Sequence, residues 1–378
     1  MTPRAKSPIR ALPFLISFGM LPLLWLGAAH GGWMLILPPL YGYGVLSLLD
    51  AVLTRSEENP PVETAETALF RHRLITLVWP AFELAAIYGS IWWSAQPGAL
   101  GPVEKLALFF GIGLTTGAVG IVYAHELMHQ RNRTERWLAD ILMALVLYSH
   151  FRSEHLLVHH RYVGTVRDAV TARYNEGFHR FFPRVLREGP ASAWRAERQL
   201  LARAGRGMGD RSNPFWRYGL LQAAALGAAF ALGGWQGVGL FAFQALVAVW
   251  HLELTNYVEH YGLTRRHLGE GRYESVAPHH SWNADHRATN WFLINLQRHS
   301  DHHFRPDRRY PLLQTYAADQ APQLPYGYPA MTWLAMIPPL WRRRMNPRVR
   351  AWRRRFYPDV TDWGDYNRGR LPMPRGAS

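Results

Sequence analysis

Six stretches of the chain are almost entirely apolar, and each has about the length of a membrane span. They cover residues 12–29, 32–53, 73–95, 105–124, 214–232 and 238–257. A helix needs ~20 apolar residues to cross the core of a bilayer. Polar, Arg-rich stretches separate and follow these runs. The mean hydropathy of −0.16 is therefore an average over apolar and polar segments and describes neither kind. The pattern predicts an all-α integral membrane protein with six transmembrane helices. For individual runs, a buried core helix is the alternative.

Basic residues are unevenly distributed among the connections. Three short predicted connections contain no Lys or Arg: Ala29–Gly32, Gln96–Glu104 and Gly233–Gly237. The N-terminal tail, the 54–72 loop and residues 125–213 and 258–378 contain nearly all of them. By the positive-inside rule, both termini and the polar parts are expected on the cytoplasmic side of a bacterial inner membrane. There they would form a helical cap, and we interpret residues 1–378 as a single multi-pass domain.

The N-terminal charges and the net charge permit further interpretations. Arg4, Lys6 and Arg10 precede the first apolar run, as in a signal peptide. A second run follows almost at once, so we interpret the two as a retained helical hairpin. The net charge of +15 suits anionic lipid headgroups or an acidic protein partner. The basic residues form no recognised nucleic-acid-binding motif, so we expect no nucleic-acid partner.

The composition includes 18 His and no Cys. Without Cys, disulfides and thiolate metal sites are excluded, so any metal must be held by His, Asp or Glu. Candidate ligands gather in HELMH (His125, His129), EHLLVHH (His155, His159, His160) and QRHSDHH (His299, His302, His303). Side chains three or four residues apart share one helix face and can reach one metal ion. HELMH alone matches a zinc protease motif. A zinc site, however, needs about three protein ligands, and eight clustered His are more than that. They are enough for two ions.

The ligand type narrows the chemistry. Imidazole-rich ligation suits Fe, Cu, Zn or Ni. Two redox metals beside a membrane-embedded pocket indicate oxygen chemistry, with iron favoured over copper. The carboxylate-rich helical bundle is the other familiar di-iron design, but the chain lacks its paired Glu-x-x-His pattern. A non-catalytic metal-binding or transport protein is a further alternative, against which the number of clustered His argues.

Several segments resemble those of the membrane di-iron alkane 1-monooxygenases, within the fatty acid desaturase/hydroxylase superfamily. The resemblance runs from LLDA (Leu48–Ala51) and ENPP (Glu58–Pro61) to WRRRMNPRV (Trp341–Val349). Its most specific segments are NYVEHYGL (Asn256–Leu263), PHHSWN (Pro278–Asn283), LQRHSDHH (Leu296–His303) and LPYGYPAM (Leu324–Met331). The chain departs from the residues usual in the family at Met128, Gln130 and Val158. By this resemblance the nine iron ligands are His125, His129, His155, His159, His160, His260, His299, His302 and His303.

The resemblance also implies a reaction. It implies hydroxylation of the terminal carbon of an alkane to a primary alcohol, with O₂ as co-substrate and two non-haem irons as cofactor. A separate rubredoxin or ferredoxin, served by an NAD(P)H reductase, would supply electrons. The positive charge predicts that it docks on the Arg-rich face, either near the His clusters (Arg131, Arg133 and Arg161) or on the C-terminal tail (Arg342–Arg344 and Arg353–Arg355). Xylene-type aromatic methyl monooxygenases share this architecture and stay an alternative, as do acyl-lipid desaturases and hydroxylases.

Carboxylates flank the predicted ligands. They are Glu126, Glu154, Asp168, Glu259 and Asp301. Such carboxylates commonly orient ligating imidazoles by accepting the second ring N–H, and a solvated charge is the alternative for each. His150 and His251 are expected to contact ligands or each other, since intramembrane ionisable groups are costly and often functional. His279, His280 and His286 are expected to pack or to form hydrogen bonds rather than to bind metal.

The second apolar run contains Gly42 and Gly44, about two turns before Asp50. By the family resemblance this run lines a substrate tunnel, and a bulky inner side chain would block a long alkane. Gly42 is expected on the inner face, so the tunnel would continue past it and admit medium and long chains. The alternative is that both glycines let two helices pack closely.

Overall fold

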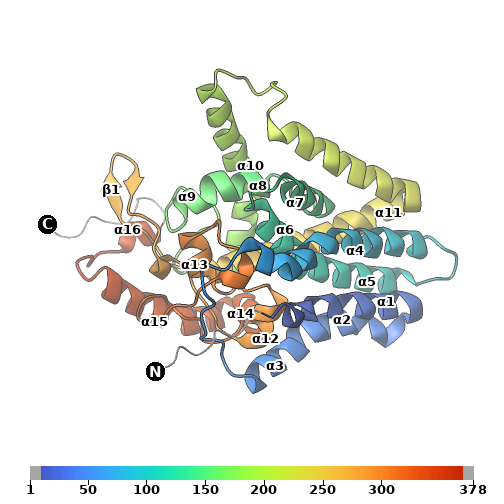
Figure 1. Cartoon of the computed structure of the whole chain (residues 1–378), viewed down its shortest axis with the longest axis horizontal. Helices are drawn as coiled ribbons and strands as arrows, with labels where there is room; N and C mark the ends of the chain where they lie inside the picture. The colour runs from blue at the N-terminus through green and yellow to red at the C-terminus, as the bar shows by residue number, and fades with distance from the viewer. Residues whose placement is uncertain (1–9, 369–378) are drawn as a thin grey trace.

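The computed structural model describes residues 10–368, so Arg4 and Lys6 lie outside the described residues. Most of the chain is helical (Figure 1). A short antiparallel hairpin, β1 (His267–Gly269) and β2 (Arg272–Tyr273), corrects the all-α prediction. Its tight turn is possible because Gly269, Glu270 and Gly271 have positive φ, which glycine adopts without strain.

Five helices within residues 10–368 are long and apolar enough to cross a membrane. They are Leu12–His30, Gly32–Val52, Glu66–Ser94, Pro102–Met128 and Pro214–His260. Their parts are η1 (Leu12–Gly19), α1 (Met20–His30), η2 (Gly32–Ile36), α2 (Leu37–Pro39), η3 (Leu40–Val45), α3 (Leu46–Val52), η4 (Glu66–Leu69), α4 (Phe70–Ser94), α5 (Pro102–Thr115), η5 (Thr116–Gly120), α6 (Ile121–Met128) and α11 (Pro214–His260). Four of these candidate spans match single predicted runs with shifted ends.

The predicted fifth and sixth runs are joined in α11, so residues 10–368 contain five such helices rather than the predicted six. A straight helix of 47 residues would measure about 70 Å, more than twice the ~30 Å core of a bilayer. The helix does not run straight, because Gly234 has φ 57° and ψ −148°. Beyond this break the chain turns back: a Cβ at Gly237 would collide with the carbonyl oxygen of Ala229. The break falls within the predicted 233–237 connection.

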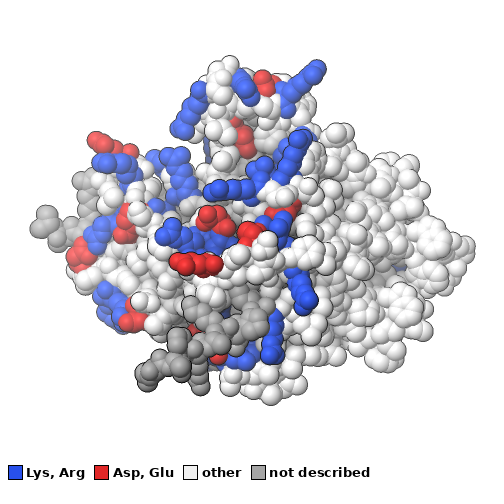
Figure 2. Space-filling model, viewed as in Figure 1, with Lys and Arg blue, Asp and Glu red and all other residues white. Residues whose placement is uncertain are grey.

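The remaining elements form a polar half beside the candidate spans. Between α6 and α11 lie α7 (Arg133–Leu145), α8 (Phe151–Glu154), η6 (His155–His159), α9 (His160–Tyr162) and α10 (Phe178–Arg203). After α11 come η7 (Pro278–His280), α12 (Arg287–Phe292), α13 (His299–Phe304), η8 (Tyr310–Leu312), α14 (Tyr328–Ala335), α15 (Pro338–Phe356) and α16 (Gly364–Asn367). Figure 2 shows Lys, Arg, Asp and Glu over this half, whereas the visible face of the spans is almost free of them.

Exposed tryptophans lie at the end of the spans remote from the polar half. Trp33 is 71% exposed and Trp235 is 80% exposed. Each follows a pair of glycines at which the chain turns between two apolar segments. Tryptophan is enriched where a membrane meets water, so this end of the bundle has the character of a membrane interface.

Candidate metal centre

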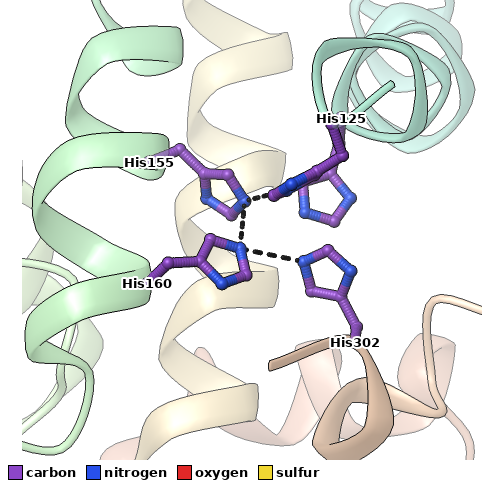
Figure 3. A group of neighbouring side chains, drawn as sticks. His125, His155, His160 and His302 are labelled. Carbon is purple, nitrogen blue, oxygen red and sulfur yellow. Dashed lines mark hydrogen bonds between the residues drawn. The ribbon is translucent and has the colours of Figure 1, made fainter. Parts of the chain in front are cut away.

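The nine predicted ligands lie in two compact groups. The five-His group consists of His125, His129, His155, His160 and His302, and the four-His group of His159, His260, His299 and His303. In each group, one ring nitrogen per residue lies within 4.8 Å of all the others. Figure 3 shows four imidazoles of the five-His group, from three separate segments, pointing toward one another. Residues distant in the sequence therefore converge on two points.

A π-helical turn divides the second sequence cluster between the groups. In η6 the backbone N–H of His160 donates to the carbonyl oxygen of His155, five residues earlier. In a regular α-helix, residues five apart point in different directions. The wider turn brings His155 and His160 together, with 3.0 Å between their Nε2 atoms. His159 then faces the four-His group.

The other two clusters are joined differently. His125 and His129, four residues apart at the end of α6, belong to one group. In α13, His299 and His303 are also four apart and belong to the four-His group, while His302 turns to the five-His group. His260 at the end of α11 completes the four-His group.

The arrangement fits metal ions held by nitrogen. Six Nε2–Nε2 distances within the groups are 3.0–3.2 Å. Nitrogen ligands at right angles, with metal bonds of about 2.0–2.1 Å, would be about 2.9 Å apart. Burial lowers the pKa of His129 to about 3, and it lowers the pKa of His155 and His302 well below the ordinary value. These imidazoles are therefore neutral, the form that offers a lone pair to a metal.

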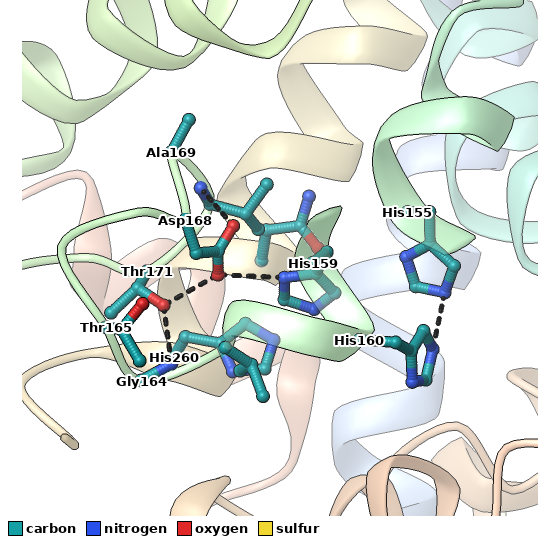
Figure 4. Close-up of polar contacts among 12 residues, drawn as sticks. His155, His159, His160, Gly164, Thr165, Asp168, Ala169, Thr171 and His260 are labelled. Carbon is teal, nitrogen blue, oxygen red and sulfur yellow. Dashed lines mark hydrogen bonds and ion pairs between the residues drawn. The ribbon is translucent and has the colours of Figure 1, made fainter. Parts of the chain in front are cut away.

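Asp168 orients one imidazole of the four-His group. Nδ1 of His159 donates to Oδ2 of Asp168 over 2.9 Å, and both side chains are buried (Figure 4). The carboxylate is itself fixed, because the Thr171 hydroxyl and the Val170 backbone N–H donate to it over 2.7 and 3.0 Å. A hydrogen bond at Nδ1 directs Nε2 toward the centre of the group.

Glu259 meets the four-His group from the other side. Its Oε2 lies 3.4 Å from Nε2 of His299, the nitrogen that faces the group, and its Oε1 accepts a hydrogen bond of 2.9 Å from the Tyr328 hydroxyl. Glu259 is therefore placed beside the metal-binding atoms rather than behind a ring.

The other three predicted carboxylates form no hydrogen bond with the nine His. Glu126 accepts hydrogen bonds from the Gln130 amide and the Tyr310 backbone N–H. Asp301 accepts from Arg308, Gln314 and Tyr316. Glu154 is buried with no hydrogen-bond partner within the described range. Burial raises the pKa of Glu154 well above its ordinary value, and nearby Asp168 and Glu253 raise it further.

The remaining His residues lie outside both groups. Nε2 of His280 is 3.0 Å from the Tyr357 hydroxyl, and His279 stacks on Phe356 with 4.3 Å between ring centroids. These contacts fix the C-terminal helices, as the packing hypothesis for the two residues expects. His150 contacts the ring of Tyr148. His286 lies near Asp50, and His251 lines the cavity described next.

A narrow, mainly apolar cavity leads from the candidate spans to the His groups. Its outer part is lined by Gly42, Tyr43 and Leu114, and its inner part reaches His125, His155 and His299. The two parts share Ala118, His251, Thr255 and Leu293 as lining residues. Each part is narrow, with a cavity volume of about 30 Å³. The cavity thus connects the apolar half of the molecule to both groups.

The two glycines of the second span differ in position. Gly42 lines the cavity, and a Cβ there would meet nothing within 4 Å. This favours the tunnel interpretation over close helix packing at Gly42. Gly44 is exposed, and its nearest neighbour would be the side chain of Leu40. Gly44 is not among the residues that line the cavity.

Two residues that the sequence patterns did not single out, Asp50 and Arg298, hold the cap against the spans. Asp50 at the end of α3 accepts hydrogen bonds from the backbone N–H and the hydroxyl of Thr289, in the first turn of α12. Thr289 in turn lines the cavity. Arg298, next to His299, donates to the carbonyl oxygens of Ser56, Glu58 and Leu313. A charge at the end of an apolar run was the available signal for Asp50.

Comparison with known proteins defines the class. Residues 102–335 match the family model described as fatty acid desaturase. The chain is 39% identical to alkane 1-monooxygenase 2 of Pseudomonas aeruginosa over 325 residues, which cover 85% of each chain. It is 36% identical to alkane 1-monooxygenase of Ectopseudomonas oleovorans over 353 residues, 91% of this chain and 84% of the relative. The xylene/toluene monooxygenase hydroxylase component of Pseudomonas putida is 24% identical over 322 residues, 84% of this chain and 80% of the relative.

The match covers more than half of the chain and contains all nine clustered His, from His125 to His303. The chain therefore belongs to the fatty acid desaturase family, among its alkane 1-monooxygenase members. The resemblance carried by the sequence segments is thereby confirmed.

Proposed function

We propose that the protein is a membrane alkane 1-monooxygenase that converts a terminal methyl group to a primary alcohol. The observation that carries this proposal is an apolar cavity that starts among the candidate spans and ends at nine His in two groups. Relatives named alkane 1-monooxygenase, at 36–39% identity over most of the chain, support the choice of substrate.

Two iron ions are the proposed cofactor, one in each group. The ligands would be His125, His129, His155, His160 and His302 for one ion, and His159, His260, His299 and His303 for the other. When bound, the irons would supply the activation of O₂ that the hydroxylation of an unactivated C–H bond requires. The chain itself keeps the imidazoles neutral by burial and fixes the ring of His159 through Asp168.

Substrate recognition would depend on shape and apolar burial. An alkane has no polar group, and each methylene moved from water to an apolar site contributes about 0.8 kcal/mol. Leu114, Ala118 and Leu293 offer such a surface along the cavity. The terminal carbon would reach the space between His125, His155 and His299. A narrow cavity would admit the chain end-on and exclude water from the reacting carbon.

The topology extends this proposal. We infer that the two halves of α11 are separate spans joined at Gly234, which makes six spans in all. The Arg-rich half, with the His groups at its boundary, would then face the cytoplasm across a bacterial inner membrane, as the distribution of basic residues indicates. We interpret residues 1–378 as one functional domain, because the ligands come from segments between 125 and 303 and the cavity also includes Gly42.

Electrons must come from a redox partner. Each hydroxylation consumes R–CH₃, O₂, two electrons and two protons and yields R–CH₂OH and water. The 378 residues contain no Cys, so they provide no thiolate-bound redox centre. A rubredoxin or ferredoxin served by an NAD(P)H reductase is the proposed donor. The alkane would enter from the membrane lipid, in which it dissolves. We propose no nucleic-acid partner.

The aromatic methyl monooxygenases are the second candidate class. The observation that favours them is the 24% identity to the xylene/toluene monooxygenase component. The reaction in that case would also hydroxylate a methyl group, but on a wide, flat ring. The narrow cavity favours a linear chain.

Reconstitution tests the function. Purified protein in lipid vesicles is supplied with rubredoxin, reductase, NADH and ¹⁸O₂, and with octane, dodecane, hexadecane or p-xylene in parallel. The expected products are 1-alkanols that carry ¹⁸O, and metal analysis is expected to give about two Fe per chain. A desaturated product, a clear preference for p-xylene, or protein with one Zn and no Fe would contradict the proposal.

A further inference from the structure

A groove on the polar half lies against the metal centre. One wall is α10, and the other is formed by η6, α9 and the loop that follows; the groove holds about 600 Å³. Leu157 and Val158 form part of its floor. Four arginines line it: Arg161, Arg167, Arg195 and Arg203. The groove is separate from the substrate cavity, since the two share no lining residue.

The floor of the groove is the outer side of the segment that carries the ligands. Leu157 and Val158 lie between His155 and His159 in η6, and their side chains face the groove while the two imidazoles face the metal centre. The loop on the same wall repeats this arrangement. Arg167 and Ala169 line the groove, and Asp168 between them accepts the hydrogen bond from His159. Figure 4 shows Asp168 and its neighbours beside His159. A group in the groove is thus separated from the ligands by a single layer of chain.

The charge of the groove is predominantly positive. The arginines named above are exposed. Glu188 is the acidic residue that lines the groove, and it is already 3.7 Å from Arg184 and 3.3 Å from Arg187, neither of which lines it. A basic concave surface with low-dielectric walls attracts an acidic partner and accelerates its association.

We propose that this groove is the docking site of an acidic, one-electron carrier protein, whose redox group comes to rest over Leu157 and Val158. The inference rests on the proposed function, which requires a donor. Two reduced carriers would dock in succession and each would give up one electron. With two protons and O₂, these electrons convert R–CH₃ to R–CH₂OH and water. Electron-transfer complexes are small and transient, and a groove of this size suits such contact.

Charge reversal along α10 tests the proposal with a control on the same helix. Arg195→Glu and Arg203→Glu change groove residues, whereas Arg198→Glu changes an exposed arginine of α10 that is not among the residues lining the groove. In the vesicle assay, turnover is measured against carrier concentration. Each groove variant is expected to raise the KM for the carrier about tenfold with kcat nearly unchanged, since electrostatic steering alters association rates by ~10-fold or more. Arg198→Glu is expected to change KM less than about twofold.

A second electron source separates this inference from the proposed function. Dithionite with a small mediator dye replaces the carrier, and the groove variants are expected to hydroxylate alkane at the wild-type rate. If the wild type makes no alkanol with either source, the proposed function fails. If it does, and KM for the carrier is the same in wild type and groove variants, the docking site is wrong. An equal effect of Arg198→Glu would also overturn it, as would a loss of activity that follows anionic lipid content rather than carrier concentration.

Discussion

The two His groups have similar ligands but different surroundings. The four-His group is fully buried, and two carboxylates reach it: Asp168 behind His159 and Glu259 beside His299. In the five-His group, His129 and His160 are partly exposed, and no ion pair with a carboxylate is described for its members. We infer that the chain tunes the first group by fixed carboxylates and the second by the number of imidazoles. The two groups should therefore respond differently to the same kind of substitution.

Removal of one ligand from each group should have the largest effect. His160→Ala and His303→Ala are each expected to leave about one iron per chain instead of two and to lower turnover by more than about 100-fold, since even residues that only orient a ligand cost 10–100-fold. Iron is measured by elemental analysis and turnover by alkanol production. His30→Ala, at an exposed position far from both groups, is the control. An equal loss in the control would mean that the clusters have no special role.

The cavity contacts both groups, and a change at its outer part should affect substrate length instead of iron. Gly42→Trp places an indole where a Cβ meets open space. If the indole displaces about four methylene groups, a long alkane loses ~3 kcal/mol of binding, roughly 100-fold. Turnover of hexadecane should fall accordingly, while that of octane stays near the wild-type value.

Gly44→Trp is the matched control for Gly42→Trp. Gly44 lies two residues further along the same helix, is exposed and is not among the residues lining the cavity. It should leave the ratio of hexadecane to octane turnover unchanged. Should Gly42→Trp lower both substrates together, or should both variants act alike, the tunnel interpretation would be wrong.

Asp168 provides a sharper test of the difference between the groups. Asp168→Asn retains the size of the side chain but removes its charge, so the ring of His159 loses a charged acceptor. Retention of iron by the four-His group should weaken by about 10–100-fold, as substitutions of such residues commonly do. Titration with a chelator measures this as one weakened site and one unchanged site.

Glu197→Gln is the control for Asp168→Asn. Glu197 is a buried carboxylate nearby that accepts a hydrogen bond from Ser153 and contacts no imidazole. It should leave both sites unchanged. If Asp168→Asn weakens both sites equally, the two groups are not tuned separately.

The sequence predicted which nine His residues come together, but not which of them belong to the five-His group and which to the four-His group. His125 and His129 share a group because an α-helix places residues four apart on one face. For His155, His159 and His160 this rule failed, because the π-helical turn in η6 changes the direction of each side chain. Helical spacing contains no information about where such a turn occurs. Residue spacing also gave Asp168, Glu126 and Asp301 the same predicted role, that of orienting a ligating imidazole. Glu126 and Asp301 instead bind the 308–316 segment, a tertiary contact that spacing does not reveal.

Hydropathy predicted the membrane half well but not the number of separate helices. Four of the predicted runs correspond to single candidate spans. The last two predicted runs form one continuous element, α11, in which Gly234 is the single position with non-helical φ and ψ. Hydropathy does not show that the chain turns at this residue without a separate loop. The roles of Asp50 and Arg298 depend on contacts with residues more than 200 positions away, which no local pattern reveals.

The smallest effect is expected at Tyr328, which supports Glu259 in the four-His group. Tyr328→Phe removes the hydroxyl that donates to Oε1 of Glu259 and leaves this buried oxygen without that donor. Loss of a buried hydrogen bond costs about 1–3 kcal/mol, so the Tm should fall by a few degrees. Tyr257→Phe removes a comparable buried hydroxyl, which donates to the carbonyl oxygen of Glu176 instead of a carboxylate near the metal centre. Both variants should lose similar stability, but only Tyr328→Phe should release iron from the four-His group more readily, about threefold to tenfold. Because the five-His group has no such carboxylate, its iron should be unaffected in both variants. Equal iron release from both variants would mean that Glu259 contributes only to packing.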